Sequence, residues 1–160
     1  SPPRLMILLD TRVAQRRPAH HADVEICIAM AASLASYALE ADLPVGLITW
    51  SDGIRTIEPQ RGKRHRRDLL TLLAQLPLNT AYGAEELLQA AYATLDGVAT
   101  PVLITPSAQT DPRSTMVTIR PHTPQAERWF RFDPRIDFAH AMPPDQQLQR
   151  AVGFEVRDRG

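Results

Sequence analysis

The stretch Leu5-Met6-Ile7-Leu8-Leu9-Asp10 decides the fold class of this chain. Five apolar residues in a row, with no alternation, are typical of a strand buried on both faces, as the strands of parallel sheets are. Burial on both faces requires a layer of helices on each side of the sheet. We therefore predict an α/β domain in which Asp10 stands at the carboxyl end of a buried strand.

The chain after Asp10 alternates between segments with helical and with strand patterns. Apolar residues recur at helical spacing in three segments, so we predict helices over 24–40, 64–76 and 84–95. Short apolar or alternating runs predict strands over 45–50, 54–58, 102–105 and 115–120. Asp23 is the expected N-cap of the first helix because its carboxylate can accept the free backbone N–H groups there.

A turn signal, Ser51-Asp52-Gly53, joins the strands 45–50 and 54–58 into a hairpin, so the sheet should be mixed. Helices between the other strands indicate parallel crossovers. The order of elements therefore predicts a doubly wound, Rossmann-like three-layer sandwich, with a mostly parallel sheet and one antiparallel edge hairpin.

The last third of the chain is expected to be less regular. The link 106–114 has nine residues, whereas a parallel crossover takes about a dozen, so the strand 115–120 follows either an abbreviated crossover or an antiparallel turn. A short strand at 129–132 and a helix at 143–150 are the remaining expectations. Prolines gather in this part, so we predict an irregular C-terminal extension over 121–160.

Composition is that of one globular domain of 160 residues, 44% hydrophobic and 22% charged. The net charge of +0 gives no overall field that attracts nucleic acid or an anionic membrane. Cys27 is the single cysteine, so no internal disulfide is expected. The apolar stretch 26–39 has 14 residues, short of the roughly 20 that cross a bilayer, so we expect no membrane helix. Ser1-Pro2-Pro3-Arg4 leads directly into a strand, as in a domain excised from a longer protein.

Ligand sites in doubly wound folds lie at the carboxyl ends of the strands, near the switch in strand order. Residues at or next to such strand ends here are Asp10, Thr11, Trp50, Ser51 and Thr105, and the loop residue Thr80 can reach them. Trp50 has two interpretations, an exposed anchor for a partner or a cover of the core.

Several short sequence segments within Leu5–Thr105 resemble those of one bacterial protein family. Val45-Gly46-Leu47, Pro59-Gln60-Arg61-Gly62, and His65 with the leucine pairs after it are similar to the von Willebrand factor A-like half of "domain of unknown function 58". The resemblance implies a membrane-anchored parent protein, often encoded beside a MoxR-type AAA+ ATPase. It also implies an adaptor that binds partners through a metal-ion-dependent adhesion site.

That adhesion site needs Asp-x-Ser-x-Ser after the first strand, a loop threonine and a second aspartate, because Mg²⁺ takes oxygen ligands. Asp10 matches the first aspartate and Thr80 the loop threonine. The serine positions hold Arg12 and Ala14, and the second aspartate position falls at Pro106 or Ser107. We therefore predict that no Mg²⁺ binds. A contact of Asp10 with Arg12 or Thr80 would replace the ion, with the guanidinium standing in for its charge.

Other interpretations of polar residues stay open. Asp10 is either a remnant metal ligand or an ordinary turn acceptor. A phosphohydrolase with Asp10 as nucleophile would need an acid two residues later, where Arg12 stands. His20-His21 with Asp23 and Glu25 suggests a transition-metal site but has no third histidine or cysteine nearby. Cys27, on an apolar helix face, is expected to be a buried, inert thiol.

The strongest charge run is Arg61-Gly62-Lys63-Arg64-His65-Arg66-Arg67. Its candidate anion-binding residues are Arg61, Lys63, Arg64 and Arg67. Cations near a helix N-terminus destabilise the helix by about 0.3–1 kcal/mol. This cost favours an anion-binding role, with an anionic partner surface, a phosphate or a nucleic acid as ligand. The alternative interpretation is a solvated helix face without a ligand. The segment contains no aromatic residue for base stacking, so nucleic acid is not expected.

The leading hypothesis is a non-enzymatic protein-interaction module without a cofactor. Its partner would be a MoxR-type AAA+ ATPase or a client of one, at the cytoplasmic face of a bacterial membrane, with no membrane contact by this fragment. The expected partner-binding residues are Asp10, Thr11, Arg12, Trp50, Ser51 and Thr80.

Overall fold

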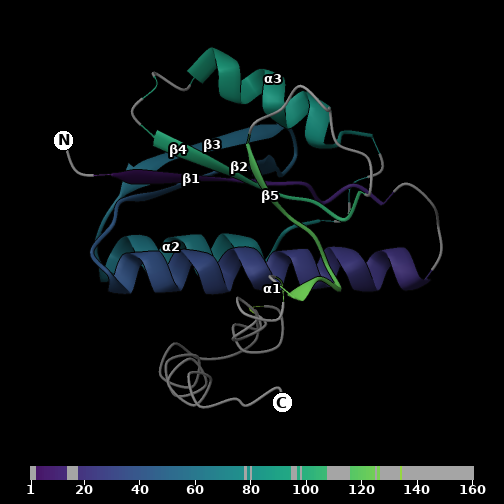
Figure 1. The fold of residues 1–160 in the computed structure, drawn as a ribbon, viewed down its shortest axis with the longest axis horizontal. Helices are drawn as coiled ribbons and strands as arrows, with labels where there is room; N and C mark the ends of the chain where they lie inside the picture. Colours follow the sequence, from purple (N-terminus) through teal and green to yellow (C-terminus); the bar gives the residue numbers. More distant parts are fainter. Residues whose placement is uncertain are drawn as a thin grey trace.

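A computed structural model describes residues 3–13, 18–77, 79, 81–94, 97, 99–107, 116–124, 126 and 134. Within this part of the chain, five strands form one sheet in the order β3-β2-β1-β4-β5 (Figure 1). The strands are β1 (Arg4–Leu9), β2 (Val45–Trp50), β3 (Ile54–Gln60), β4 (Ala99–Ile104) and β5 (Val117–Ile119). All neighbouring pairs are parallel except β2 and β3. The prediction of a mixed α/β fold with one antiparallel pair is confirmed.

Helices cover both faces of the sheet. α1 (Pro18–Glu40) and α2 (Lys63–Ala74) lie side by side on one face, and α3 (Ala84–Thr94) lies on the other (Figure 1). Alternate residues of β1 enter two separate apolar clusters. Ile7 and Leu9 pack with α1 and α2, whereas Met6 and Leu8 pack with α3. This double burial explains why the β1 sequence is apolar without alternation.

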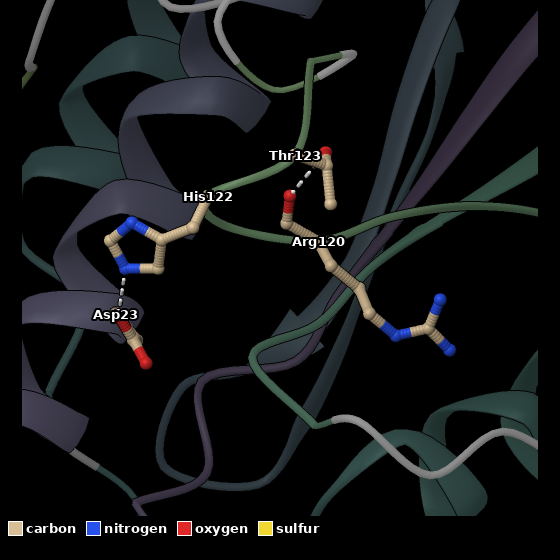
Figure 2. Close-up of polar contacts among 4 residues, drawn as sticks. All are labelled: Asp23, Arg120, His122 and Thr123. Carbon is tan, nitrogen blue, oxygen red and sulfur yellow. Dashed lines mark hydrogen bonds and ion pairs between the residues drawn. The ribbon is translucent and has the colours of Figure 1, made fainter.

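The first helix begins earlier than its apolar pattern indicates. It starts at Pro18, and proline suits a first helical turn because its missing N–H has no partner there anyway. The predicted N-cap at Asp23 is wrong, because Asp23 lies inside α1 and pairs with His122, at 2.7 Å from Oδ1 to Nε2 (Figure 2).

By length and composition, α1 is also a candidate membrane span. Its segment Ala19–Glu40 has 22 residues and contains an 18-residue window with a mean hydropathy of 1.5, so the length argument based on 26–39 does not exclude a membrane span. In this fold 67% of its most apolar window is buried. A core helix passes the same test, and the small buried side chains of α1, such as Ala31, Ala32 and Ala35, pack in the same cluster as residues of α2 and the sheet.

The hairpin β2–β3 forms as predicted, and Asp52 and Gly53 in its turn both have positive φ, 52° and 112°. Gly46 is required for a close approach within this hairpin. A Cβ at that position would lie 2.6 Å from the carbonyl oxygen of Ile57, where the pairing of the two strands shifts register.

The fifth strand was expected to follow either an abbreviated parallel crossover or an antiparallel turn. The structure shows the parallel arrangement, because Val117 pairs in parallel with Val102. After β5 a turn leads back to α1, where Ala126 joins the apolar cluster around that helix. The predicted strand at 129–132, the helix at 143–150 and most of the predicted extension 121–160 lie outside the described residues.

Candidate functional site

Asp10 is a buried carboxylate at the carboxyl end of β1, only 2% exposed. Oδ1 accepts a hydrogen bond from the backbone N–H of Arg12 at 2.9 Å, and Oδ2 accepts one from the Thr105 hydroxyl at 2.6 Å. Thr105 follows β4, whose Ile104 pairs with Leu9 in the sheet. The two side chains meet because neighbouring parallel strands end at the same edge.

A chain of polar contacts extends from this pair. The Thr105 hydroxyl oxygen accepts the backbone N–H of Ser107 at 3.0 Å, and the carbonyl of Ser107 accepts Nε of Arg120 at 2.9 Å. Figure 2 shows the turn after β5, in which Arg120 and Thr123 are bonded and His122 reaches Asp23 of α1. The edge of the sheet is thereby tied to the first turns of α1.

The electrostatic setting of Asp10 disfavours its ionised form. Burial raises the pKa of Asp10 above its ordinary value. Hydrogen bonds from Thr105 and from the backbone of Arg12, together with the positive charge of Arg12, act in the opposite direction, while the charge of Glu86 raises the pKa further. The net effect is a carboxyl group that holds its proton more tightly than an exposed aspartate.

A pocket of about 460 Å³ opens beside Asp10. Its walls come from the end of β1, the first turns of α1, the first turn of α3 and the segment after β4. The lining residues are Asp10, Arg12, His20, Asp23, Gly83, Ala84, Glu85, Glu86, Pro106 and Ser107. The order of strands reverses between β1 and β4, so the pocket lies at the switch point where open α/β sheets bind ligands.

The loop before α3 forms one wall and is held from both sides. Its backbone pairs with the segment after β1, where the N–H of Val13 donates to the carbonyl of Asn79 at 2.7 Å. The side-chain oxygen of Asn79 accepts the N–H of Tyr82 at 3.0 Å. At the start of α3, the Glu86 carboxylate accepts the N–H of Gly83 at 2.9 Å, as in a capping box.

Arg12 meets Asp10 in a different way from the one predicted. We expected its guanidinium to stand in for a metal charge, but the recorded hydrogen bond comes from its backbone N–H. The exposed side chain lies against the loop instead, with Cδ 3.1 Å from the position that a Cβ on Gly83 would take. The alternative contact, from Thr80 to Asp10, falls outside the described residues. Thr105, which we had placed at the edge but not among the binding residues, supplies the second contact.

The remaining predicted binding residues lie at the same edge but do not line the pocket. Trp50 is half-buried and stacks on Tyr82, with ring centroids 4.0 Å apart and an interplanar angle of 26°. Ser51 belongs to the hairpin turn, where its N–H donates to the carbonyl of Gly53. Thr11 is buried, and its hydroxyl has no hydrogen-bond partner in the structure as described.

Comparisons with protein-family models and with curated proteins find no match. The function of this chain therefore has to be argued from the geometry of its own residues. Asp10 and Arg12, which we predicted at this edge, line the same pocket as Ser107 and Glu86, which were not among the predicted binding residues. The available signal was the glutamate three residues after Gly83, at capping-box spacing.

The described histidines and Cys27 belong to no group of side chains that could hold a metal ion. Among the described residues, no three or more His, Cys, Asp or Glu side chains are grouped so that they could hold a metal ion. His20 and Asp23 line the pocket, but His21 is exposed outside it. Cys27 is fully buried, and burial, followed by the charges of Asp10 and Asp23, raises the pKa of its thiol well above the ordinary value.

The basic run is separated from the pocket. His65 and Arg66 bond near the amino end of β2, where His65 Nε2 lies 2.6 Å from the carbonyl oxygen of Val45. The pocket lies at the opposite, carboxyl end of the parallel strands. Arg61, Lys63, Arg64 and Arg67 are therefore not part of the site around Asp10.

Proposed function

We propose that this chain is a non-enzymatic, von Willebrand factor A-like interaction module of the "domain of unknown function 58" type, with a degenerate metal-ion-dependent adhesion site. It binds a partner protein at the pocket beside Asp10. One observation carries the proposal: both carboxylate oxygens of Asp10 are taken by donors of the chain itself, the Arg12 N–H and the Thr105 hydroxyl.

The sheet supports the finer description of the fold. The order β3-β2-β1-β4-β5, with β3 antiparallel at one edge and helices on both faces, is what a doubly wound, Rossmann-like sandwich requires. The pocket lies at the switch point of that order. This is the position at which the resemblance implies that partners bind.

The residues at the expected metal position do not fit Mg²⁺. A hard divalent ion needs several oxygen ligands at about 2.0–2.1 Å. Here Asp10 faces two hydrogen-bond donors, Arg12 adds a cation, and the backbone N–H of Ser107 is turned toward Thr105. An ion would have to displace donors and tolerate a neighbouring positive charge. Binding by surface complementarity needs neither.

Catalysis by Asp10 is the less favoured alternative. A nucleophilic carboxylate must present a free oxygen to its substrate. Asp10 is 2% exposed, the pKa of its carboxyl group is raised, and both of its carboxylate oxygens accept hydrogen bonds. The same features suit a residue that holds the ends of β1 and β4 together under a binding surface.

The partner and location follow from the resemblance. We propose a MoxR-type AAA+ ATPase, or a client delivered to one, as the partner, with the parent protein anchored in a bacterial membrane and this domain on the cytoplasmic face. Arg12 and the stacked pair of Trp50 and Tyr82 provide the exposed contacts, since arginine and aromatic side chains dominate interface energies.

Binding to a purified MoxR-type ATPase of the same organism tests the proposal, measured by biolayer interferometry in EDTA. We expect saturable binding that Arg12→Glu weakens about tenfold or more. Arg55→Glu, which reverses an exposed charge on β3, is the matched control and should leave the affinity unchanged. Binding that requires Mg²⁺, or equal losses for both variants, would contradict the proposed surface.

Calorimetric titration with Mg²⁺ or Mn²⁺ tests the degenerate site directly. We expect no saturable heat. Submillimolar binding that Asp10→Ala abolishes would restore a working adhesion site and overturn the metal-independent mechanism.

A further inference from the structure

Four cations at the start of α2 form what we call the basic surface: Arg61, Lys63, Arg64 and Arg67. All four side chains are exposed. No ion pair or side-chain hydrogen bond joins any of them to another residue that the structure describes.

Two neighbours in the same run behave differently. His65 is buried and bonds to the carbonyl of Val45 at 2.6 Å. Arg66 lies 3.7 Å from the carboxylate of Glu40, and its Nε donates to Ser36 at 3.4 Å. The fold thus uses the members of the run that point toward α1 and β2. Within the part of the chain that the structure describes, the charges of the other four make no such contacts.

The position of these charges is costly within the monomer. α2 has no acidic residue in its first turn, and its N-cap Gly62 makes no side-chain capping bond. Cations near the positive end of a helix are unfavourable by about 0.3–1 kcal/mol each, and like charges three residues apart, as at Arg64 and Arg67, repel. An anionic partner would offset both effects.

We propose that the basic surface docks an acidic segment of a partner protein. Charge complementarity identifies the partner as anionic. Nucleic acid is disfavoured because 51–81 contains no aromatic residue on which a base can stack. Exposed Glu58 and Asp68 flank the surface in sequence, where they would repel a continuous phosphate backbone. The carboxylates of a peptide can be spaced to avoid them.

This surface is separate from the pocket of the proposed function. The two lie at opposite ends of β2, whose six residues span roughly 20 Å at about 3.3 Å each. One module can therefore bind two partners at once. A substitution that abolishes binding at one surface should leave binding at the other unchanged.

Fluorescence anisotropy of a labelled oligo-glutamate peptide, titrated with the full chain at low salt, tests the proposal. We expect saturable binding that weakens as salt rises, and that Arg64→Glu and Arg67→Glu each weaken about tenfold. Arg55→Glu is the matched control and should bind like the wild type. Arg12→Glu should also bind normally, because its defect belongs to the pocket.

Three outcomes would overturn the acidic-segment proposal. They are an absence of peptide binding, equal losses for Arg55→Glu and Arg64→Glu, and tighter binding to labelled DNA than to the peptide. Circular dichroism of each variant checks that it is folded, since surface substitutions of this kind change stability by about 0.5 kcal/mol or less.

Discussion

At the carboxyl ends of β1 and β4, Asp10 and Thr105 bond to each other in the interior, and little of their charge or polarity reaches solvent. At the amino end of β2, by contrast, the cations of the basic surface are exposed and have no ion pair or side-chain hydrogen bond with any residue that the structure describes. Both ends are polar edges of the same sheet. They differ in whether the polar side chains find hydrogen-bond or ion-pair partners within the described part of the chain.

The difference separates two kinds of polar residue. Where partners lie inside the fold, removing one leaves the other buried and unsatisfied, so stability suffers. Where the partner must come from outside, removal costs binding and leaves the fold intact. The predictions below test whether each end behaves as this division requires.

The largest effect is expected for Asp10→Ala. It leaves the buried Thr105 hydroxyl without its acceptor, at a cost of about 1–3 kcal/mol, and removes the part-buried bond from the Arg12 N–H, worth about 0.5–1.5 kcal/mol. Urea denaturation should therefore show a loss of about 2–4 kcal/mol in the free energy of unfolding. Asp10→Asn keeps an acceptor and the shape, so its loss should be much smaller. Equal losses would show that the two bonds do not hold this edge together.

His65→Ala tests, within the basic run, the distinction between residues that stabilise the fold and residues that bind a partner. The substitution removes the contact to the carbonyl of Val45, so we expect a loss of about 1–3 kcal/mol by denaturation. Arg64→Ala, one residue away and exposed, should stay within about 0.5 kcal/mol of the wild type. A comparable loss for Arg64→Ala would mean that the exposed cations also support the fold.

The pH dependence of stability tests the setting of Asp10. Because its pKa is raised in the folded chain, folding favours the protonated form. The stability of the wild type relative to Asp10→Asn should be greatest below the ordinary aspartate pKa of about 4. It should fall as the pH rises through the raised pKa and level off above it. If the stability of the wild type relative to Asp10→Asn instead increases with pH, the contacts with Thr105 and Arg12 stabilise the ionised carboxylate by more than its burial destabilises it.

Much of the fold could be predicted from the sequence because its signals are local. The uninterrupted apolar run of β1 and the Ser51–Gly53 turn each indicate one structure. The start of α1 could not be found in this way, since 18–23 lacks the apolar periodicity of the rest of the helix, and Asp23 pairs there with His122 of a distant segment. That pair joins residues 99 positions apart.

The site was predictable in position but not in its contacts. The place of Asp10 at the ligand-binding edge follows from the end of the strand. Its bond to Thr105 depends on which strand lies beside β1 and in which register, and a sequence without aligned relatives does not reveal either. The charge of Arg12 acts on Asp10 as expected, but the hydrogen bond comes from its backbone N–H, while its side chain lies beside Gly83.

The smallest effect should have the opposite sign. Lys63→Glu places an acid in the first turn of α2, where it interacts favourably with the helix dipole, so we expect a gain of about 0.3–1 kcal/mol that shrinks with added salt. Arg55→Glu, in a strand without such a dipole, should show no gain. The same Lys63→Glu variant should bind the oligo-glutamate peptide less well. A substitution that strengthens the fold while weakening the contact would mean that the lysine serves a partner, whereas a loss of stability would show that an internal contact holds it.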